Sequence, residues 1–285
     1  MGVAGSNPTL STEIIPIFKI MNKIKQRYDE IDFVRGGFVI GMIVFHFLYQ
    51  LHYIFGFHSI NKHVMKIMPF LSSGFFILMG ISLYISYYHG KFDTRFSLLK
   101  RFLYIFIPAA ILTISTKIAG YGTYDYFGVL HCMAFSTIIG YMFIKVPSLI
   151  VFILSYLIIF IGFYISNLYI CDCNLIEHCF YYGLLDEKYG KPLDHFPLLP
   201  HLGFVLLGIY LGKVYYTNGQ RQFNYYFPSY LNFVYIPFKF IGRHMISTYM
   251  LHVPIIFCLT DMFLKIFKSD HYIDVIEHIR VYFNK

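Results

Sequence analysis

Apolar stretches of about 20 residues recur along the chain, and short polar segments separate them. A helix of that length rises about 30 Å, enough to cross the hydrocarbon core of a bilayer. The ten-residue alternating segments typical of a transmembrane β-barrel are absent from the sequence. The pattern predicts an all-α, polytopic membrane bundle of about seven helices, with six to eight allowed. The predicted spans are 33–55, 67–88, 99–118, 127–145, 147–170, 197–216 and 244–267.

The composition agrees with this class of protein. Hydrophobic residues make up 57% of the 285 residues and charged residues 13%, and the mean hydropathy is +0.58. A soluble domain carries about 25% charged residues. The sequence therefore predicts a lipid bilayer as the surroundings of most of the chain.

The distribution of Lys and Arg predicts which side each loop faces, because cytoplasmic loops carry the excess of positive charge. With a cytoplasmic N-terminus, the outer side holds few cations before the C-terminal tail, namely Lys62, Lys66, Lys117, Lys188 and Lys191. The inner side holds Lys19, Lys23, Lys25, Arg27, Lys91, Arg95, Lys100, Arg101, Lys145, Lys213, Arg221, Lys239 and Arg243. The basic C-terminal tail departs from this pattern, so an eighth, re-entrant or interfacial segment is an alternative there.

Three regions are predicted from these patterns. Residues 1–30 form a cytoplasmic tail with a basic, interfacial amphipathic helix near 13–28, residues 31–268 form the transmembrane domain, and residues 269–285 form an amphipathic tail. The formal net charge of +8 is explained by loops facing anionic lipid. Nucleic acid is not expected as a partner, because no basic, aromatic-rich domain lies outside the spans.

Three of the five cysteines cluster in "CDCNLIEHCF", as Cys171, Cys173 and Cys179. In an outer loop these residues are read as a disulfide with a free thiol, or as plain thiols. Zinc is the weaker reading, because the spacing fits no standard ligand pattern. No metal is therefore expected. The sequence does not determine the oligomeric state, and a homo-oligomer is one of the possibilities.

The first span, "DFVRGGFVIGMIVFHF", carries ionisable residues that a lipid-facing helix avoids. Arg35 and His46 are eleven residues apart, which is three turns plus about 20° and a rise of about 16 Å. Both side chains therefore project from one face, and Asp32 can brace Arg35 across one turn. Gly36 would let another helix or a ligand approach closely.

Two readings of these residues compete. Arg35 could reach lipid headgroups and His46 could bond to a neighbouring helix, which would make both structural. An ionisable residue at the middle of a span is a functional candidate by default. The geometry therefore favours the functional reading, in which Arg35 binds an anion and His46, on the same helix face, is a buried chemical centre.

Four segments in order resemble the catalytic-domain family of heparan-α-glucosaminide N-acetyltransferases and its bacterial relatives, within the wider membrane-bound acyltransferases. They are "IDFVRGGFVIGMIVFH", "YFGVLHCMAFSTIIG", "LDHFPLLPHLGFVLLGIYLGK" and "IGRHMISTYMLHVPII". The wider group shares an arginine, ten residues and then a histidine, as at Arg35 and His46. The chain departs from the family pattern at His195, His201 and Val253. These differences bear on the identity of the acceptor more than on membership of the family.

The resemblance implies transfer of an acetyl group from cytoplasmic acetyl-CoA, as co-substrate, to an extracytoplasmic sugar or glycolipid, on an amine or a hydroxyl. The phosphates of acetyl-CoA need cations at the cytoplasmic rim, and an arginine fork suits phosphate oxygens. Candidates are Arg35, Lys100, Arg101 and Arg243, with His244 beside them. Membrane anchoring is the competing reading, and it is favoured slightly for Lys100.

His46 is the leading catalytic candidate, either as a general base on the acceptor or as a nucleophile that briefly carries the acetyl group. His131 could bind the acceptor or stabilise the thioester oxygen, and Asp194 could orient a sugar or cap a helix. His252 is assigned to hydrogen bonding in the core, and Asp32 to supporting Arg35.

A small transporter or lipid-handling protein that uses His46 as a proton relay is the alternative function. Against it, the sequence shows no inverted repeat and no pair of matching broken helices. A partner subunit with a decayed site is a third reading. A chain rich in Phe, Tyr and Ile, without tryptophan, favours a bacterial plasma membrane; in a eukaryote with lysosomes, the resemblance would point to the lysosomal membrane.

Overall fold

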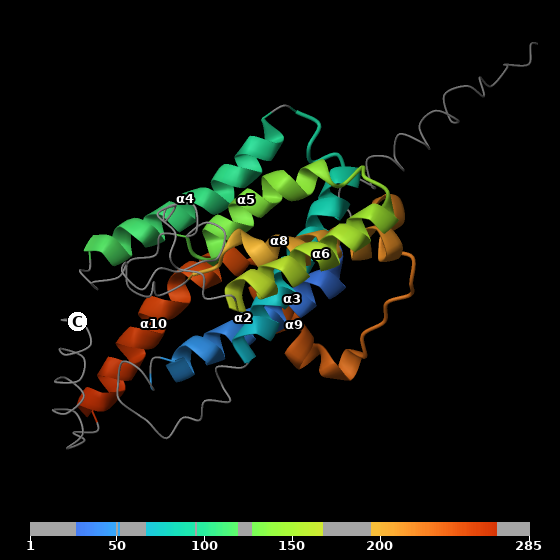
Figure 1. The fold of residues 1–285 in the computed structure, drawn as a ribbon. Coiled ribbons are helices and arrows are strands. Elements are labelled where there is room, and N and C mark those ends of the chain that lie inside the picture. Colours follow the sequence, from blue (N-terminus) through green and yellow to red (C-terminus); the bar gives the residue numbers. More distant parts are fainter. Residues whose placement is uncertain are drawn as a thin grey trace, which may run out of the picture.

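The computed structural model describes residues 27–49, 51, 67–94, 96–118, 127–167 and 195–266, and every regular element in these ranges is helical. Figure 1 shows the long helices lying side by side along a roughly common direction. The helices are α2 (Asp29–Tyr49), α3 (Met68–Tyr88), α4 (Ser97–Ile118), α5 (Val129–Met142), α6 (Ser148–Asn167), α8 (Leu198–Tyr215), α9 (Asn232–Arg243) and α10 (Met245–Ile266). Two 3-10 turns, η4 (Thr217–Gly219) and η5 (Ser229–Leu231), precede α9.

The predicted class of a polytopic helical membrane protein is confirmed. Five of the described helices, α2, α3, α4, α6 and α8, are long and apolar enough to cross a membrane. Two shorter apolar helices, Val129–Met142 and the Met245–Thr260 part of α10, occupy the remaining predicted spans. Helix α2 begins at Asp29, four residues before the predicted start, because Asp29, Glu30 and Asp32 suit the positive end of the helix dipole.

Helix α8 lies at the centre of the bundle and packs against α3 and α6. Gly80 of α3 and Gly208 of α8 make this approach possible, since a Cβ on either residue would overlap the backbone of the other helix. Small residues at such contacts bring helices close enough for dispersion forces to hold them where lipid supplies no hydrophobic drive. The main core cluster, which includes Phe76, Leu83 and Ile209, surrounds this contact.

Helix α9 is an element that the apolar pattern did not predict. It is amphipathic. Its apolar side chains Phe233, Ile236 and Phe240 lie on an exposed face, while Tyr235 and Gly242 on the other face are buried. Its buried face packs along the first turns of α2. A pattern of 20-residue apolar runs does not include such a helix, because it has 12 residues and only one apolar face.

The polar loop after α8 is fastened to the start of α2. Tyr28 Oη donates a hydrogen bond of 2.8 Å to the Gly219 carbonyl. Arg221 donates from Nη1 to both carboxylate oxygens of Glu30, at 3.1 and 3.2 Å, and Tyr216 Oη also donates to Glu30, at 3.2 Å. In the segment "TNGQRQ", Gly219 and Arg221 therefore hold two distant parts of the chain together.

Candidate functional site

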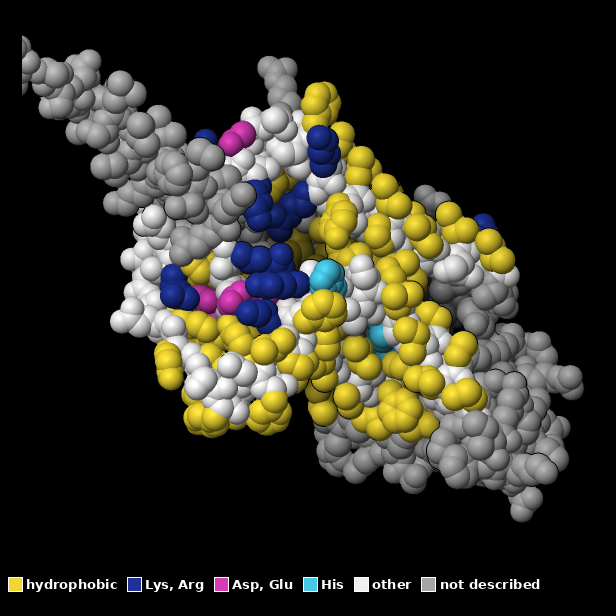
Figure 2. Space-filling model, turned by 180° about the vertical axis from the view of Figure 1, so that it is seen from behind, with side chains coloured by type: hydrophobic (Ala, Val, Ile, Leu, Met, Phe, Trp, Pro, Cys, Tyr) yellow, Lys and Arg dark blue, Asp and Glu magenta, His cyan; other side chains and the backbone are white. Residues whose placement is uncertain are grey.

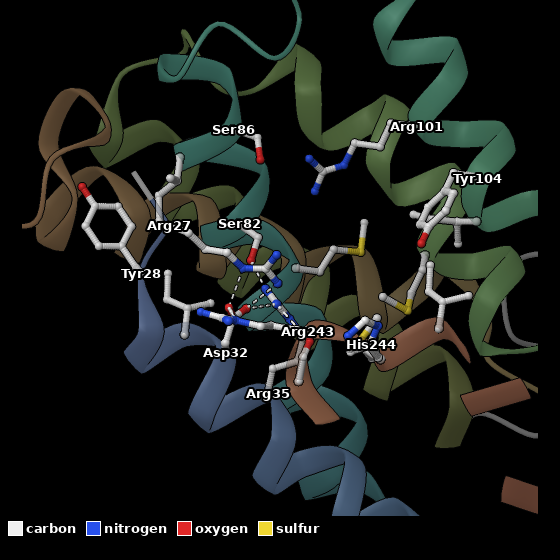
Figure 3. A pocket seen from close by; sticks show the side chains of 18 of the residues that line it. Arg27, Tyr28, Asp32, Arg35, Ser82, Ser86, Arg101, Tyr104, Arg243 and His244 are labelled. Carbon is white, nitrogen blue, oxygen red and sulfur yellow. Dashed lines mark hydrogen bonds and ion pairs between the residues drawn. The ribbon is translucent and has the colours of Figure 1, made fainter. Parts of the chain in front are cut away.

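A cavity of about 440 Å³ lies at the end of the bundle where α2 and α4 begin, α3 ends and α9 meets α10. Figure 3 shows side chains from these elements pointing toward a common space. Most of the polar lining is basic or hydroxylic. The polar lining residues are Arg27, Tyr28, Asp32, Arg35, Ser82, Ser86, His89, Lys91, Arg101, Tyr104, Arg243, His244 and Ser247.

Asp32 is the centre of an arginine cluster on one wall of the cavity. Its side chain is 3% exposed and accepts from Arg27 Nε at 2.5 Å, Arg35 Nη1 at 2.8 Å and Arg243 Nε at 3.3 Å. The predicted brace between Asp32 and Arg35 is therefore present. One carboxylate cannot neutralise three guanidinium groups, so this wall keeps positive charge.

Arg35 is held in one orientation by its neighbours. Its Nη2 donates to Ser82 Oγ at 2.7 Å, and Nη1 also reaches the Gly242 carbonyl at 3.4 Å. Ser82 in turn donates to the Leu78 carbonyl at 2.7 Å. A guanidinium fixed on three sides is preorganised, so a ligand that bonds to it loses little side-chain entropy on binding.

The opposite wall adds two further cations, Lys91 and Arg101. Among the ion pairs of the described residues, none involves Lys91 or Arg101. Arg101 lies over the Phe92 ring, 5.6 Å from its centroid. Burial lowers the pKa of the Lys91 ammonium, and the nearby Arg101 and Arg27 charges lower it further, whereas Asp32 raises it. These cations crowd one another, so an anion between them would relieve the repulsion.

Charge and size together indicate what this cavity can hold. Five Lys and Arg side chains face one carboxylate in its lining, and Asp29 outside it pairs with Arg243 at 2.8 Å and with Lys239 at 3.1 Å. The volume lies within the range of about 300–1,000 Å³ found for small-molecule sites. Figure 2 shows Lys and Arg gathered around a hollow, with hydrophobic side chains over the neighbouring surface. The site fits an anion with several negative oxygens.

A pair of histidines lies along the same seam between α2 and α10. The rings of His46 and His252 are 4.9 Å apart, centroid to centroid, at an interplanar angle of 60°. His46 lies in the last turn of the described α2, eleven residues from Arg35 and about 16 Å along the helix axis. It was expected near the middle of its span.

Hydrogen bonding fixes the tautomer of His252. Its Nδ1 lies 2.6 Å from the Tyr249 carbonyl oxygen, and because a carbonyl only accepts, Nδ1 carries the hydrogen. In a neutral ring Nε2 is then an unprotonated acceptor. This Nε2 is buried and has no hydrogen-bond partner among the described residues. His252 was assigned to core hydrogen bonding, which its Nδ1 does, but Nε2 remains available to a proton.

An apolar cluster separates the cavity from the histidine pair. Val39, Met42 and Phe75 are buried together, with Met245 packed against them. Phe75 and Met245 also line the cavity, whereas His46 lies one turn beyond Met42 on α2. The cavity and the histidines are therefore two ends of one seam, joined by side chains that suit an apolar part of a ligand.

The structure brings together some of the predicted residues and not others. Arg35, Arg101, Arg243 and His244 line one cavity, and the His244 ring packs on Phe240 at 4.7 Å. Lys100 is exposed and is not part of the lining.

His131 and Asp194 are not placed in this site. His131 is buried against Phe127 and Phe106, with ring centroids 5.9 and 5.7 Å away. Asp194 lies outside the described residues, as does the cluster of Cys171, Cys173 and Cys179. Within the part of the chain that the structure describes, no three His, Cys, Asp or Glu residues are grouped to hold a metal ion.

Sequence reasoning missed several members of the site. Arg27 and Lys91 were counted only as cytoplasmic charge, and Tyr104 and Ser82 were not singled out. The contact between His46 and His252 was also missed. The only signal for Arg27 was its position eight residues before Arg35, which places both on one side of a helix start; the others depend on which helices are neighbours.

These observations define a multi-pass α-helical membrane protein with a cation-lined cavity at one end of its bundle. The chain belongs to the family described as heparan-alpha-glucosaminide N-acetyltransferase, catalytic, which matches residues 27–254. No curated protein and no solved structure matches it significantly. The family is that of an acetyltransferase-type enzyme, so the resemblance seen in the four sequence segments is confirmed.

Proposed function

We propose that this protein is a membrane acetyltransferase that moves an acetyl group from acetyl-CoA to an amine or hydroxyl of a sugar or glycolipid on the other side of the membrane. The observation that carries the proposal is the cation cavity, in which Arg101 and Lys91 form no ion pair with an acid of the described residues. Family membership supplies the acetyl chemistry. A multi-pass protein of this composition fits a bacterial plasma membrane.

The donor would bind with its phosphates among Arg35, Lys91, Arg101 and Arg243. Guanidinium forks bond to phosphate oxygens in pairs, and the preorganised Arg35 adds selectivity for a planar array of oxygens. The pantetheine arm would then follow the apolar cluster of Met42 and Phe75 toward His46. Its thioester would reach the histidine pair, about 16 Å from Arg35 along α2.

The histidine pair would handle the protons of the transfer. The acceptor oxygen or nitrogen attacks the thioester carbonyl, its proton passes to the imidazole of His46, and the carbon–sulfur bond breaks. The imidazolium then returns the proton to the departing sulfur, so CoA leaves as a thiol. His252 Nε2 can accept a hydrogen bond from His46 and so orient its ring, as the third group of a triad does.

The first experiment measures acetyl-CoA binding and thiol release for purified wild type and three variants. Arg101→Gln should weaken binding about tenfold or more, which is about 1.4 kcal/mol. Lys100→Gln removes the same charge one residue earlier on an exposed side chain, and its affinity should stay within about twofold. His46→Ala should bind the donor but release thiol at least about 100-fold more slowly.

The outcomes separate the competing functions. Equal binding of acetyl-CoA by wild type and Arg101→Gln would contradict the role of Arg101 in binding the phosphates. Undiminished thiol release by His46→Ala would contradict the role of His46 in the chemical step. Label that stays on the protein without an acceptor, after hydrolysis by water is excluded, would indicate an acetyl-enzyme in place of direct transfer. Proton flux that depends on His46 and is indifferent to acetyl-CoA would favour the transporter alternative.

A further inference from the structure

The cation cavity lies near one end of the bundle and opens on its side. The long helices lie lengthwise in Figure 1, so the view from behind in Figure 2 looks at the flank of the bundle, and the basic hollow is visible there. Helix α4 packs mainly on α5 and touches α10 only lightly. The rim between these helices includes Tyr104, which is 67% exposed, and Arg243, whose side chain is 38% exposed.

An apolar stripe begins at this rim and follows α4. Its members are Tyr104, Ile107, Ile111, Ile114 and Ile118, and their spacing of three or four residues places them on one helix face. Their exposed fractions run from 51% at Ile111 to 80% at Ile118. Ile111 lies ten residues after Arg101, about 15 Å along the axis, which is half of the ~30 Å hydrocarbon core.

A basic hollow followed by half a bilayer of apolar surface matches one class of molecule. A phospholipid has a negative phosphate at its head and an acyl chain that reaches about the middle of the bilayer. Anionic lipid is also attracted to basic residues close to the membrane surface by about 1 kcal/mol per cation. Arg101 and Lys91, without acid partners among the described residues, supply the unbalanced charge.

We infer that an anionic phospholipid from the leaflet next to the cavity docks at this opening, with its headgroup phosphate at Arg101 and its acyl chain along the α4 stripe. Because the same cations line the donor's proposed site, the lipid and acetyl-CoA would exclude one another; this competition rests on the proposed function. The lipid would then keep the cavity occupied until the donor displaces it.

The absence of tryptophan from the chain provides a clean test. Tyr104→Trp places a single fluorophore at the opening, and Tyr156→Trp is the matched control. Tyr156 is 54% exposed and lies eight residues into α6, as Tyr104 lies seven residues into α4, but it does not line the cavity. Each variant is placed in nanodiscs with acyl-chain-brominated phosphatidylglycerol or phosphatidylcholine at the same mole fraction.

The expected result is stronger quenching of Trp at position 104 by the anionic lipid, by about twofold, with equal quenching at position 156 by the two lipids. Adding Arg101→Gln to the Tyr104→Trp chain should abolish the difference, whereas adding Lys100→Gln should leave it. Glycerol phosphate in solution should not compete, because it lacks the acyl chain. Equal preference at both positions, or a preference that survives Arg101→Gln, would overturn the inference.

The shared use of the cavity is tested separately. In the Tyr104→Trp variant with no other substitution, acetyl-CoA should relieve the extra quenching by the anionic lipid. If acetyl-CoA binds in phosphatidylcholine nanodiscs but leaves the quenching unchanged, the two ligands do not compete for the cavity. If acetyl-CoA does not bind in any nanodisc, the proposed function fails while the lipid result stands on its own.

Discussion

Arg35 and Arg101 carry the same charged group but differ in what surrounds it. Arg35 is bonded to Asp32 and Ser82 at 2.8 and 2.7 Å, so its guanidinium serves both the fold and the cavity. Arg101 has an aromatic ring beside it and no ion pair among the described residues. Removing Asp32 would leave three guanidinium groups together without the carboxylate that they share, whereas removing Arg101 should relieve repulsion and leave the fold intact.

Lys91 gives the site a dependence on pH that can be measured. Its pKa is lowered by partial desolvation in the cavity wall and by neighbouring arginines, so it loses its proton at a lower pH than an isolated, fully solvated lysine does. The affinity for acetyl-CoA should therefore fall as the pH rises through this lowered pKa, because one cation is lost. Calorimetric titration across the alkaline range checks this.

The matched variant for this prediction is Lys91→Arg. A guanidinium keeps its proton throughout the alkaline range, so the affinity of this variant should change little over the same interval. A parallel fall in wild type and Lys91→Arg would assign the effect to another group.

At the scale of elements, the placement of α9 depends on two glycines. A Cβ on Gly36 would overlap the carbonyl oxygen of Phe238, and one on Gly242 would overlap the carbonyl oxygen of Asp32. This close approach brings Arg243, the last residue of α9, to Asp32. The helix that closes the cavity is therefore positioned by backbone contact, and a side chain at either glycine would push it away.

Gly36→Ala should lower the stability by about 1–3 kcal/mol through overpacking and weaken acetyl-CoA binding by shifting Arg243. Gly37→Ala is the matched control, because its Cβ would meet only the Phe238 ring, at 3.8 Å. That substitution should be neutral or stabilising by up to about 1 kcal/mol, since alanine is the better helix former. Thermal unfolding followed by circular dichroism should show a lower melting temperature for Gly36→Ala and an unchanged or higher one for Gly37→Ala.

At the scale of the whole molecule, the distribution of charge predicts the orientation in the membrane. The cation cavity should face the cytoplasm, where acetyl-CoA is made available to the enzyme. An epitope tag inserted after Asn224, which is exposed, should be detected only after the membrane is permeabilised. A tag inserted after Lys62, predicted outside, should be detected on intact cells. The reverse pattern of detection would show that the topology is inverted and would contradict the proposal that the cavity binds acetyl-CoA.

Much of the molecule follows from the sequence because lipid imposes a strict rule on it. A segment in hydrocarbon must satisfy its own backbone hydrogen bonds and hide its charges, so long apolar runs determined the helical class and most of the spans. The one-turn spacing of Asp32 and Arg35 likewise determined their ion pair, because residues three apart on a helix are neighbours. The four ordered segments were enough to indicate the family.

The tertiary structure decided which distant residues meet. Local spacing could not show that His252 lies beside His46, that Lys100 faces away while Arg101 enters the cavity, or that α9 exists as a short helix packed on α2. These outcomes depend on how helices rotate and pack, and packing is set by close fits such as Gly36 against Phe238 that leave no trace in hydrophobic periodicity. The sequence determined the long apolar helices and the charges at their ends, and the contacts between helices decided which of those charges form a site.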